Sequence, residues 1–288
     1  MKTTFKCVPC FINQALNLAE DSNLKNKEVE EMIKKILTIL KDIDYNKNTP
    51  PHLAKRIYPV IYKLINTEDP YRKKKKYYNE KILEMEKDLY KKLDKKKFKY
   101  LIKMVISGNI IDFGVKHSLK EEEVFNTIDD IEKKSLKVDD SNLLKKYLRE
   151  SSSVMIIGDN CGEIVFDKIF IRVLKKRFPQ INKYYYGVRG YPVINDITME
   201  DGLQVGMDNY AELISNGDNA PGTIMDNVTE KYQEIFNDSD VIIAKGQGNF
   251  ESLSEEKNKN LFFLLMAKCS VIADKIGVDK KSLVCKRN

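Results

Sequence analysis

The chain contains 288 residues, of which 42% are hydrophobic and 32% charged, a composition typical of a globular protein with a heavily charged surface. Its most apolar stretch, Leu261 to Ala273, is shorter than the roughly 20 residues of a membrane-spanning helix and contains Lys268, so we expect no membrane association. The excess of 50 basic over 43 acidic residues does not indicate nucleic-acid binding, because the lysines alternate with acidic residues and tyrosines as on solvated helix faces.

The first motif along the chain is Cys7-Val8-Pro9-Cys10. This pair is a candidate for half of a second metal site or for a redox pair, and a purely structural role is equally consistent with the spacing. No apolar leader of the secretory type precedes Cys7, and the cysteine count of five is odd. We therefore expect a cytoplasmic protein with reduced thiols.

Residues 11–139 predict a helical region without strands. Apolar residues recur at three- and four-residue spacing in segments 12–16, 29–43, 51–65 and 78–106. The chain's two histidines, His52 and His117, lie in this region. Because the sequence also has no Gly-x-Ser-x-Gly motif, a hydrolase of the Ser-His-Asp type is not indicated.

After Leu143 the pattern changes to short apolar runs separated by helical segments such as 164–177. The candidate strands are 154–157, 183–188, 193–194, 241–244 and 262–266. This alternation predicts an α/β fold with three layers, α/β/α, and a mostly parallel sheet, preceded by the helical N-terminal region. We place the division at 1–142 for the helical region and 143–288 for a metal- and phosphate-binding domain.

Ligands of such sheets bind outside the carboxyl ends of the strands, so the loops that follow the strands are the candidate sites. In the first loop, Asp159 and Asn160 follow the strand 154–157 directly. Their oxygens are hard ligands that suit Mg²⁺ or Mn²⁺. Capping of the following helix is an equally good interpretation of these two residues.

The second loop follows the apolar run 193–194 and contains Asp196. Asp196 is a candidate third ligand beside Asp159 and Asn160, with a structural role somewhat favoured by the spacing alone. Glu200 and Asp201, further along the chain, are better interpreted as residues of the first turn of a helix, where negative charge meets the positive end of the helix dipole.

The third loop is Lys245-Gly246-Gln247-Gly248-Asn249, after the strand 241–244. A lysine beside exposed amides at a helix N-terminus is a good receptor for phosphate. The spacing of the glycines fits neither a Walker loop nor the dinucleotide-binding motif, so nucleotide binding is not indicated.

These motifs together resemble the damage-control phosphatase family, also catalogued as domain of unknown function 89, in its stand-alone archaeal and bacterial branch. The matching segments are Cys7 to Cys10, Gly108 to Phe113, Gly158 to Glu163, Asn195 to Thr198, Ser215 to Thr223 and Lys245 to Asn249. They occur in the family's order and extend over most of the chain. The position of Asn219 departs from the acidic residue expected in this family, although Asp218 is adjacent.

The resemblance implies a site built from all three loops. It implies a divalent metal, Mn²⁺, Ni²⁺, Co²⁺ or Mg²⁺, held by Asp159, Asn160 and Asp196. It implies that Lys245 contacts the substrate phosphate and that Asp159, Asp196 and Lys245 carry the catalysis. The substrate-binding set it implies is Asn160, Gly217, Asp218, Lys245, Gly246 and Asn249.

The function implied is metal-assisted hydrolysis of a small phosphorylated metabolite, such as a sugar phosphate or a phosphopantetheine-like compound, by activated water. Asp159 or Asp196 as general base or nucleophile is an open alternative within this mechanism. Two other functions compete with it: an S-adenosylmethionine-dependent carboxyl methyltransferase, and a non-catalytic metal- or phosphate-binding protein.

Overall fold

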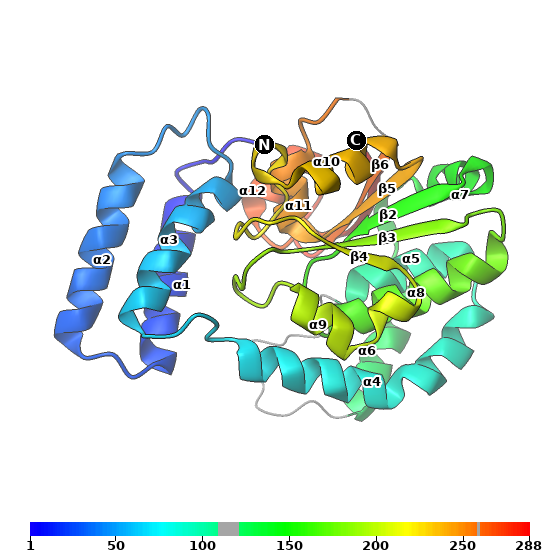
Figure 1. The fold of residues 1–288 in the computed structure, drawn as a ribbon, viewed down its shortest axis with the longest axis horizontal. Coiled ribbons are helices and arrows are strands. Elements are labelled where there is room, and N and C mark those ends of the chain that lie inside the picture. Colours follow the sequence, from blue (N-terminus) through cyan, green and yellow to red (C-terminus); the bar gives the residue numbers. More distant parts are fainter. Residues whose placement is uncertain (109–120, 258–259) are drawn as a thin grey trace.

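The computed structural model describes residues 1–108, 121–257 and 260–288. These ranges form a seven-stranded sheet in the order β1-β7-β6-β5-β2-β3-β4, in which the β6–β7 pair is antiparallel and the other pairs are parallel (Figure 1). The strands are β1 (Leu136–Asp139), β2 (Ser153–Ile157), β3 (Lys183–Val188), β4 (Glu212–Ser215), β5 (Val241–Lys245), β6 (Leu261–Met266) and β7 (Leu283–Arg287). The predicted mostly parallel sheet is confirmed.

Alternate side chains of the central strands point into two separate cores. Met155 and Ile157 of β2 face one side, covered by α10 (Glu230–Asp238), α11 (Gly246–Leu253) and α12 (Ser270–Ile276). Val154 and Ile156 face the other side. The helices packed there are α4 (Arg72–Asp94), α5 (Phe98–Ser107), α6 (Glu121–Lys133), α7 (Ser141–Glu150) and α8 (Glu163–Arg177). The predicted α/β/α layering is confirmed.

Three strands were missed and one predicted strand was wrong. The edge strands β1 and β4 are short and only partly buried, so they lack the continuous apolar run of a buried strand. The third missed strand, β7, ends in Lys286 and Arg287, so its apolar run of three residues is too short to indicate a buried strand. The predicted run 193–194 is instead loop, and Ile194 lies in a turn with a left-handed φ of 47°.

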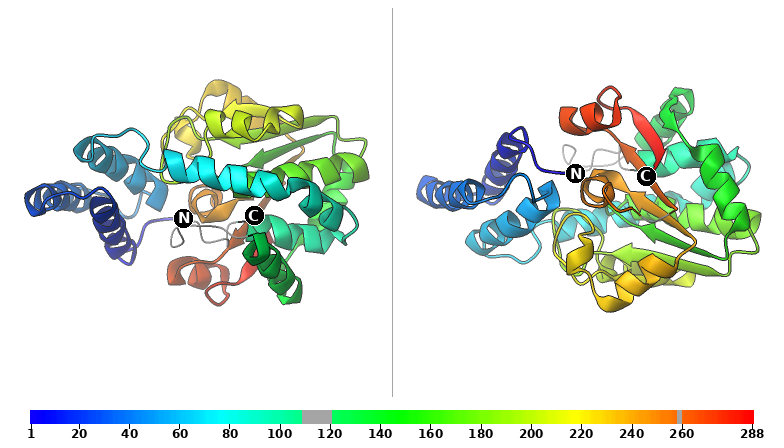
Figure 2. Two further views of the ribbon diagram at one scale, coloured as in Figure 1. Left: turned by 90° about the horizontal axis from the view of Figure 1, so that it is seen from below. Right: turned by 90° about the horizontal axis from the view of Figure 1, so that it is seen from above.

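The first three helices form a separate bundle that we call the helical unit: α1 (Cys7–Asp21), α2 (Asn26–Lys41) and α3 (Pro50–Leu64). Its core contains side chains such as Phe11, Met32, Ile36 and Ile57, together with Val193 from the loop after β3. The unit projects from one end of the sheet in Figures 1 and 2. The predicted boundary at 142/143 stays a prediction, although α4 and α5 share a core with the sheet.

The long helix predicted over 78–106 is broken. Lys95 to Lys97 separate α4 from α5, and the two helices cover the same face of the sheet. In the described part of the chain, no helix has both the length and the apolar character needed to cross a bilayer. Residues 109–113 of the predicted motif and His117 lie outside the described residues.

The chain order of the strands fixes where a ligand site can form. From β2 the chain moves to β3 and β4 on one side, and then returns to β5 and β6 on the other side of β2. The parallel strands β3, β2 and β5 end side by side, with Ile157 paired to both Gly187 and Ala244. Their following loops therefore meet at a topological switch point, the usual ligand position in such sheets.

Candidate metal and phosphate site

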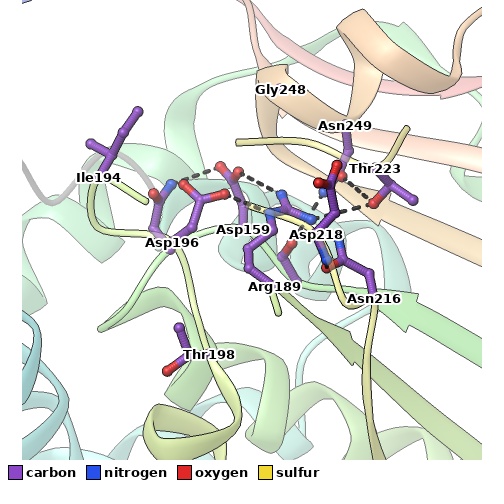
Figure 3. Close-up of polar contacts among 12 residues, drawn as sticks. Asp159, Arg189, Ile194, Asp196, Thr198, Asn216, Asp218, Thr223, Gly248 and Asn249 are labelled. Carbon is purple, nitrogen blue, oxygen red and sulfur yellow. Dashed lines mark hydrogen bonds and ion pairs between the residues drawn. The ribbon is translucent and has the colours of Figure 1, made fainter. Parts of the chain in front are cut away.

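The loops after β2 and β3 bring the three predicted metal ligands together, and Figure 3 shows two of them, Asp159 and Asp196. Asn160 and Asp196 form an isolated antiparallel bridge between the two loops. The Asn160 Nδ2 donates to Asp159 Oδ2 at 2.7 Å, which fixes the orientation of the amide. Ile197 N–H donates to the Asp159 carbonyl at 3.0 Å and ties the loops a second time. Sequence spacing alone could not show this proximity.

The donor set fits a hard divalent cation. Asp159, Asn160 and Asp196 are each at most 7% exposed and present carboxylate and amide oxygens. Burial raises the pKa of Asp196 to about 7, Arg189 opposes the shift and Asp159 adds to it. A cation between the two carboxylates would offset this cost of charge. Among the described residues no three His, Cys, Asp or Glu side chains are arranged to share a metal, so the set depends on Asn160.

Arg189, at the end of β3, is a site residue that the sequence reasoning missed. Its Nε donates to Asp196 Oδ2 at 2.7 Å, and its Nη2 lies 4.0 Å from Asp159 Oδ1. Nη1 donates to Thr223 Oγ1 at 3.3 Å. The side chain is buried, and the two aspartates raise its pKa despite that burial. Arg189 thus holds the Asp196 carboxylate by a hydrogen bond and places a second positively charged nitrogen near Asp159, and only its position directly after an apolar strand hinted at this.

Gly246 leaves the space that the Asp159 carboxylate occupies. Its φ is +77°, and a methyl group at its Cα would overlap the carboxylate of Asp159. Glycine is therefore required here for two reasons, the backbone conformation and the space. The helix α11 begins at this residue, and Gln247 and Gly248 of its first turn line the same cavity as the three candidate metal ligands.

Lys245, the residue directly before Gly246, is fully buried. Its Nζ contacts Glu163 Oε1 and Asp167 Oδ1, the latter at 2.7 Å, and Tyr186 donates to Asp167 Oδ2 at 2.7 Å. Burial raises the pKa of Glu163 and of Asp167 although Lys245 opposes the shift, and both carboxyls raise the pKa of Lys245. Direct contact of Lys245 with a substrate phosphate stays a prediction, because in this conformation its ammonium is held by the two carboxyls.

The other predicted substrate-binding residues form the frame around the site. Asn249 donates from Nδ2 to the carbonyls of Lys245 at 2.7 Å and Gly158 at 3.1 Å, which joins the loops after β5 and β2. Gly217 has a φ of +73°, and Asp218 beside it pairs with Lys55 of α3. This ion pair links the helical unit to the loop after β4. Their contacts with a substrate stay predictions.

Asp201 lies in the first turn of a helix, as the sequence favoured. It lies in the first turn of α9 (Met199–Gln204) and accepts from Thr198 N at 2.9 Å and Thr198 Oγ1 at 2.7 Å. It also pairs with the buried Lys75 at 3.0 Å. This prediction is confirmed, and Asp201 belongs to the scaffold that supports the loop after β3.

A cavity of about 320 Å³ opens above the metal-ligand set, between the helical unit and the loops of the sheet. Its floor contains Asp159, Asn160 and Asp196. Its other lining residues include Phe11, Gln14, Pro51, Ala54, Tyr58, Pro221, Gln247, Gly248, Glu251 and Val271. The cavity therefore joins a charged, oxygen-rich floor to a largely apolar wall.

Three cysteines border the same cavity. Cys7 and Cys10 come from the first turn of α1, and Cys269 precedes α12. All three are free thiols. Burial raises the pKa of the Cys10 thiol, and Cys7, Glu251 and Cys269 add to the shift. The predicted metal or redox role of Cys7 and Cys10 stays a prediction, now located at the cavity.

Glu251 in the cavity wall predicts a pH-dependent stability difference. Burial raises its pKa from 4.5 to about 7, so the folded protein loses stability as the pH rises from 4.5 through 7 and Glu251 ionises. Glu251→Gln removes this cost and still accepts the bond from Gln247 Nε2. We expect the variant to gain about 2 kcal/mol in free energy of unfolding at pH 8 and nothing at pH 4.5. Urea titrations at both pH values measure this, and an equal gain at both would contradict the assignment.

The comparisons with known proteins extend over the whole chain. The damage-control phosphatase ARMT1-like domain matches residues 3–284. The chain is 34% identical to damage-control phosphatase PH1575 of Pyrococcus horikoshii, covering 100% of this chain and 99% of the relative. It is 33% identical to a damage-control phosphatase of Archaeoglobus fulgidus, covering 99% of each.

The relative PH1575 from Pyrococcus horikoshii also has a solved structure. The crystal structure of a protein of the domain-of-unknown-function-89 family from Pyrococcus horikoshii superimposes with a TM-score of 0.91 at 32% identity, covering 100% of this chain and 99% of that one. Fold, length and sequence therefore agree from one end of the match to the other. The chain belongs to the family defined by the damage-control phosphatase ARMT1-like domain.

Proposed function

We propose that the protein is a metal-dependent phosphatase that acts on small phosphorylated metabolites. The observation that carries the proposal is the convergence of Asp159, Asn160 and Asp196 on the floor of one cavity at the switch point of the sheet. The names of the relatives from Pyrococcus and Archaeoglobus support a phosphatase as the reaction type.

The chain's own residues supply the charge and the positioning. Asp159, Asn160 and Asp196 would hold Mn²⁺, Ni²⁺, Co²⁺ or Mg²⁺, which supplies Lewis acidity and lowers the pKa of bound water. Arg189 holds the Asp196 carboxylate through its Nε. The first-turn amides of α11 suit the oxygens of a phosphoryl group, because such amides have no partner within the helix.

The cavity favours a small substrate. Its volume of about 320 Å³ is at the lower end of the range for ligand pockets. Phe11, Pro51 and Tyr58 supply apolar surface to the same cavity as the ligand set. We therefore propose a substrate whose phosphate meets the floor and whose remainder packs on this surface, a description that fits sugar phosphates and phosphopantetheine-like compounds.

The test is phosphate release from a panel of phosphomonoesters by metal-stripped protein, resupplied separately with Mn²⁺, Ni²⁺, Co²⁺ or Mg²⁺. We expect release to be negligible without metal and to return with at least one of these ions. Folded, metal-loaded protein that releases no phosphate would overturn the proposal. Methyl transfer from S-adenosylmethionine in a parallel assay would then support a methyltransferase, and metal or phosphate binding without turnover would support a binding protein.

A further inference from the structure

The loop that carries Asp196 contains a strained residue. Ile194, two positions earlier, has a φ of +47°. A β-branched side chain is disfavoured in this left-handed region, since its Cβ substituents crowd the backbone. Such a conformation persists only where the surroundings hold it in place, and it is enriched at functional sites. The question is which groups hold Ile194.

Two contacts from the helical unit hold this part of the loop. The hydroxyl of Tyr62, in the last turn of α3, accepts the Ile194 N–H at 2.9 Å. Val193 is 1% exposed, and its side chain is buried in the core formed by α1, α2 and α3. Tyr62 itself is 8% exposed and belongs to the same core, so its hydroxyl is held firmly against the loop.

The second half of the loop is held by two backbone hydrogen bonds, one to the loop after β2 and one within the loop itself. Cys161 N–H donates to the Asn195 carbonyl at 3.0 Å, and Asp196 N–H donates back to the Val193 carbonyl at 3.0 Å. The chain therefore reverses at Ile194, between the helical unit and the loop after β2. This reversal pairs the backbone of Asp196 with that of Asn160 and turns the Asp196 carboxylate toward Arg189 Nε (Figure 3).

We propose that Tyr62 is a positioning residue for the metal site: its hydroxyl holds Ile194 in the left-handed conformation that aims Asp196 at the site. The helical unit is then a part of the metal site, although it supplies none of Asp159, Asn160 and Asp196. This inference rests on the proposed metal site. It predicts that loss of one hydroxyl outside the cavity floor weakens metal binding.

The experiment compares the full-length wild type with Tyr62→Phe, Ile194→Gly and the double variant. Mn²⁺ affinity is measured by calorimetry, and hydrogen exchange of the segment 193–196 is measured without metal. Tyr62→Phe should weaken Mn²⁺ affinity about tenfold and speed exchange, because a partly buried N–H loses its acceptor and the strained turn loses one of its restraints. Glycine adopts the left-handed conformation without strain, so Ile194→Gly in the Tyr62→Phe background should recover most of the affinity.

Tyr45→Phe is the matched control. Tyr45 donates to the Leu40 carbonyl at 3.0 Å within the helical unit, so this variant also loses one hydrogen bond but should keep wild-type affinity and exchange in 193–196. Unchanged affinity and exchange in Tyr62→Phe would overturn the inference alone. A weakened Tyr62→Phe that the glycine does not rescue would also overturn it. A wild type that does not bind Mn²⁺ would overturn the metal site, while the exchange data still decide whether Tyr62 holds the loop.

Discussion

Replacing Asp159 or Asp196 with asparagine is expected to lower the rate of metal-dependent phosphate release by at least about a thousandfold. Each change keeps the shape of the side chain and removes one of the two charges that would hold the cation. At position 196 the asparagine oxygen still accepts from Arg189 Nε, so this hydrogen bond is kept in the variant. The measurement is the rate of phosphate release at saturating Mn²⁺, with Mn²⁺ affinity determined in parallel.

The control for these two variants is Asp201→Asn. Asp201 is also a buried carboxylate with an ammonium partner, Lys75, but it caps α9 instead of lining the cavity. We expect Asp201→Asn to lose stability and to keep most of its phosphate release. Retention of wild-type release by folded Asp159→Asn would rule out Asp159 as a ligand, and an equal loss of release in all three variants would indicate a general effect of removing a buried carboxylate.

The Gly246→Ala substitution is expected to reduce phosphate release at least about a hundredfold, the effect of displacing a catalytic group by about an ångström. The added methyl group would overlap the Asp159 carboxylate, so Asp159 or the start of α11 must move. The left-handed backbone at Gly246 adds a cost of about 1–2 kcal/mol in stability. Steady-state kinetics and urea unfolding separate the two effects.

Gly277→Ala is the matched control for this prediction. Gly277, after α12, has a similar φ of +81°, but nothing lies within 4 Å of the position that a methyl group would take. Gly277→Ala should therefore lose about 1–2 kcal/mol in stability and keep its catalytic rate. If both alanine variants kept the wild-type rate, the close contact of Gly246 with Asp159 would not matter for function.

The sequence predicted the layers of the fold and placed two of the candidate ligands at the edge of the sheet, for a physical reason. Apolar runs buried on both faces of a sheet are visible in sequence, and polar residues directly after them mark the loops at its carboxyl edge. Asp159 and Asn160 satisfy this rule. Asp196 satisfied it only by accident, because the run before it, 193–194, is no strand and is buried partly in the helical unit.

Other features depend on contacts between distant segments and could not be predicted. The Arg189 interactions with two aspartates require the loops after β2 and β3 to meet. The pairing of Lys245 with Glu163 and Asp167 requires the start of α8 to lie beside the end of β5. The sequence also could not predict that α1, α2 and α3 form their own core while α4 and α5 pack on the sheet. Apolar spacing shows that a helix is amphipathic but not which core its apolar face joins.

The cavity has a further consequence for how the protein is made. Its lining begins at Lys6 and ends at Val271, and the central strand pair β2–β5 joins residues more than eighty positions apart, as in Val154 with Val241. The helices α1, α2 and α3 pack on one another within residues 7–64 and can begin to assemble early in synthesis, although Val193 completes their core, whereas the strand pair must wait for distant partners. A nascent chain on the ribosome therefore has no complete cavity until the segment through Val271 has emerged. A chain truncated before β5 has the aspartates but lacks Gly246, which leaves room for the Asp159 carboxylate.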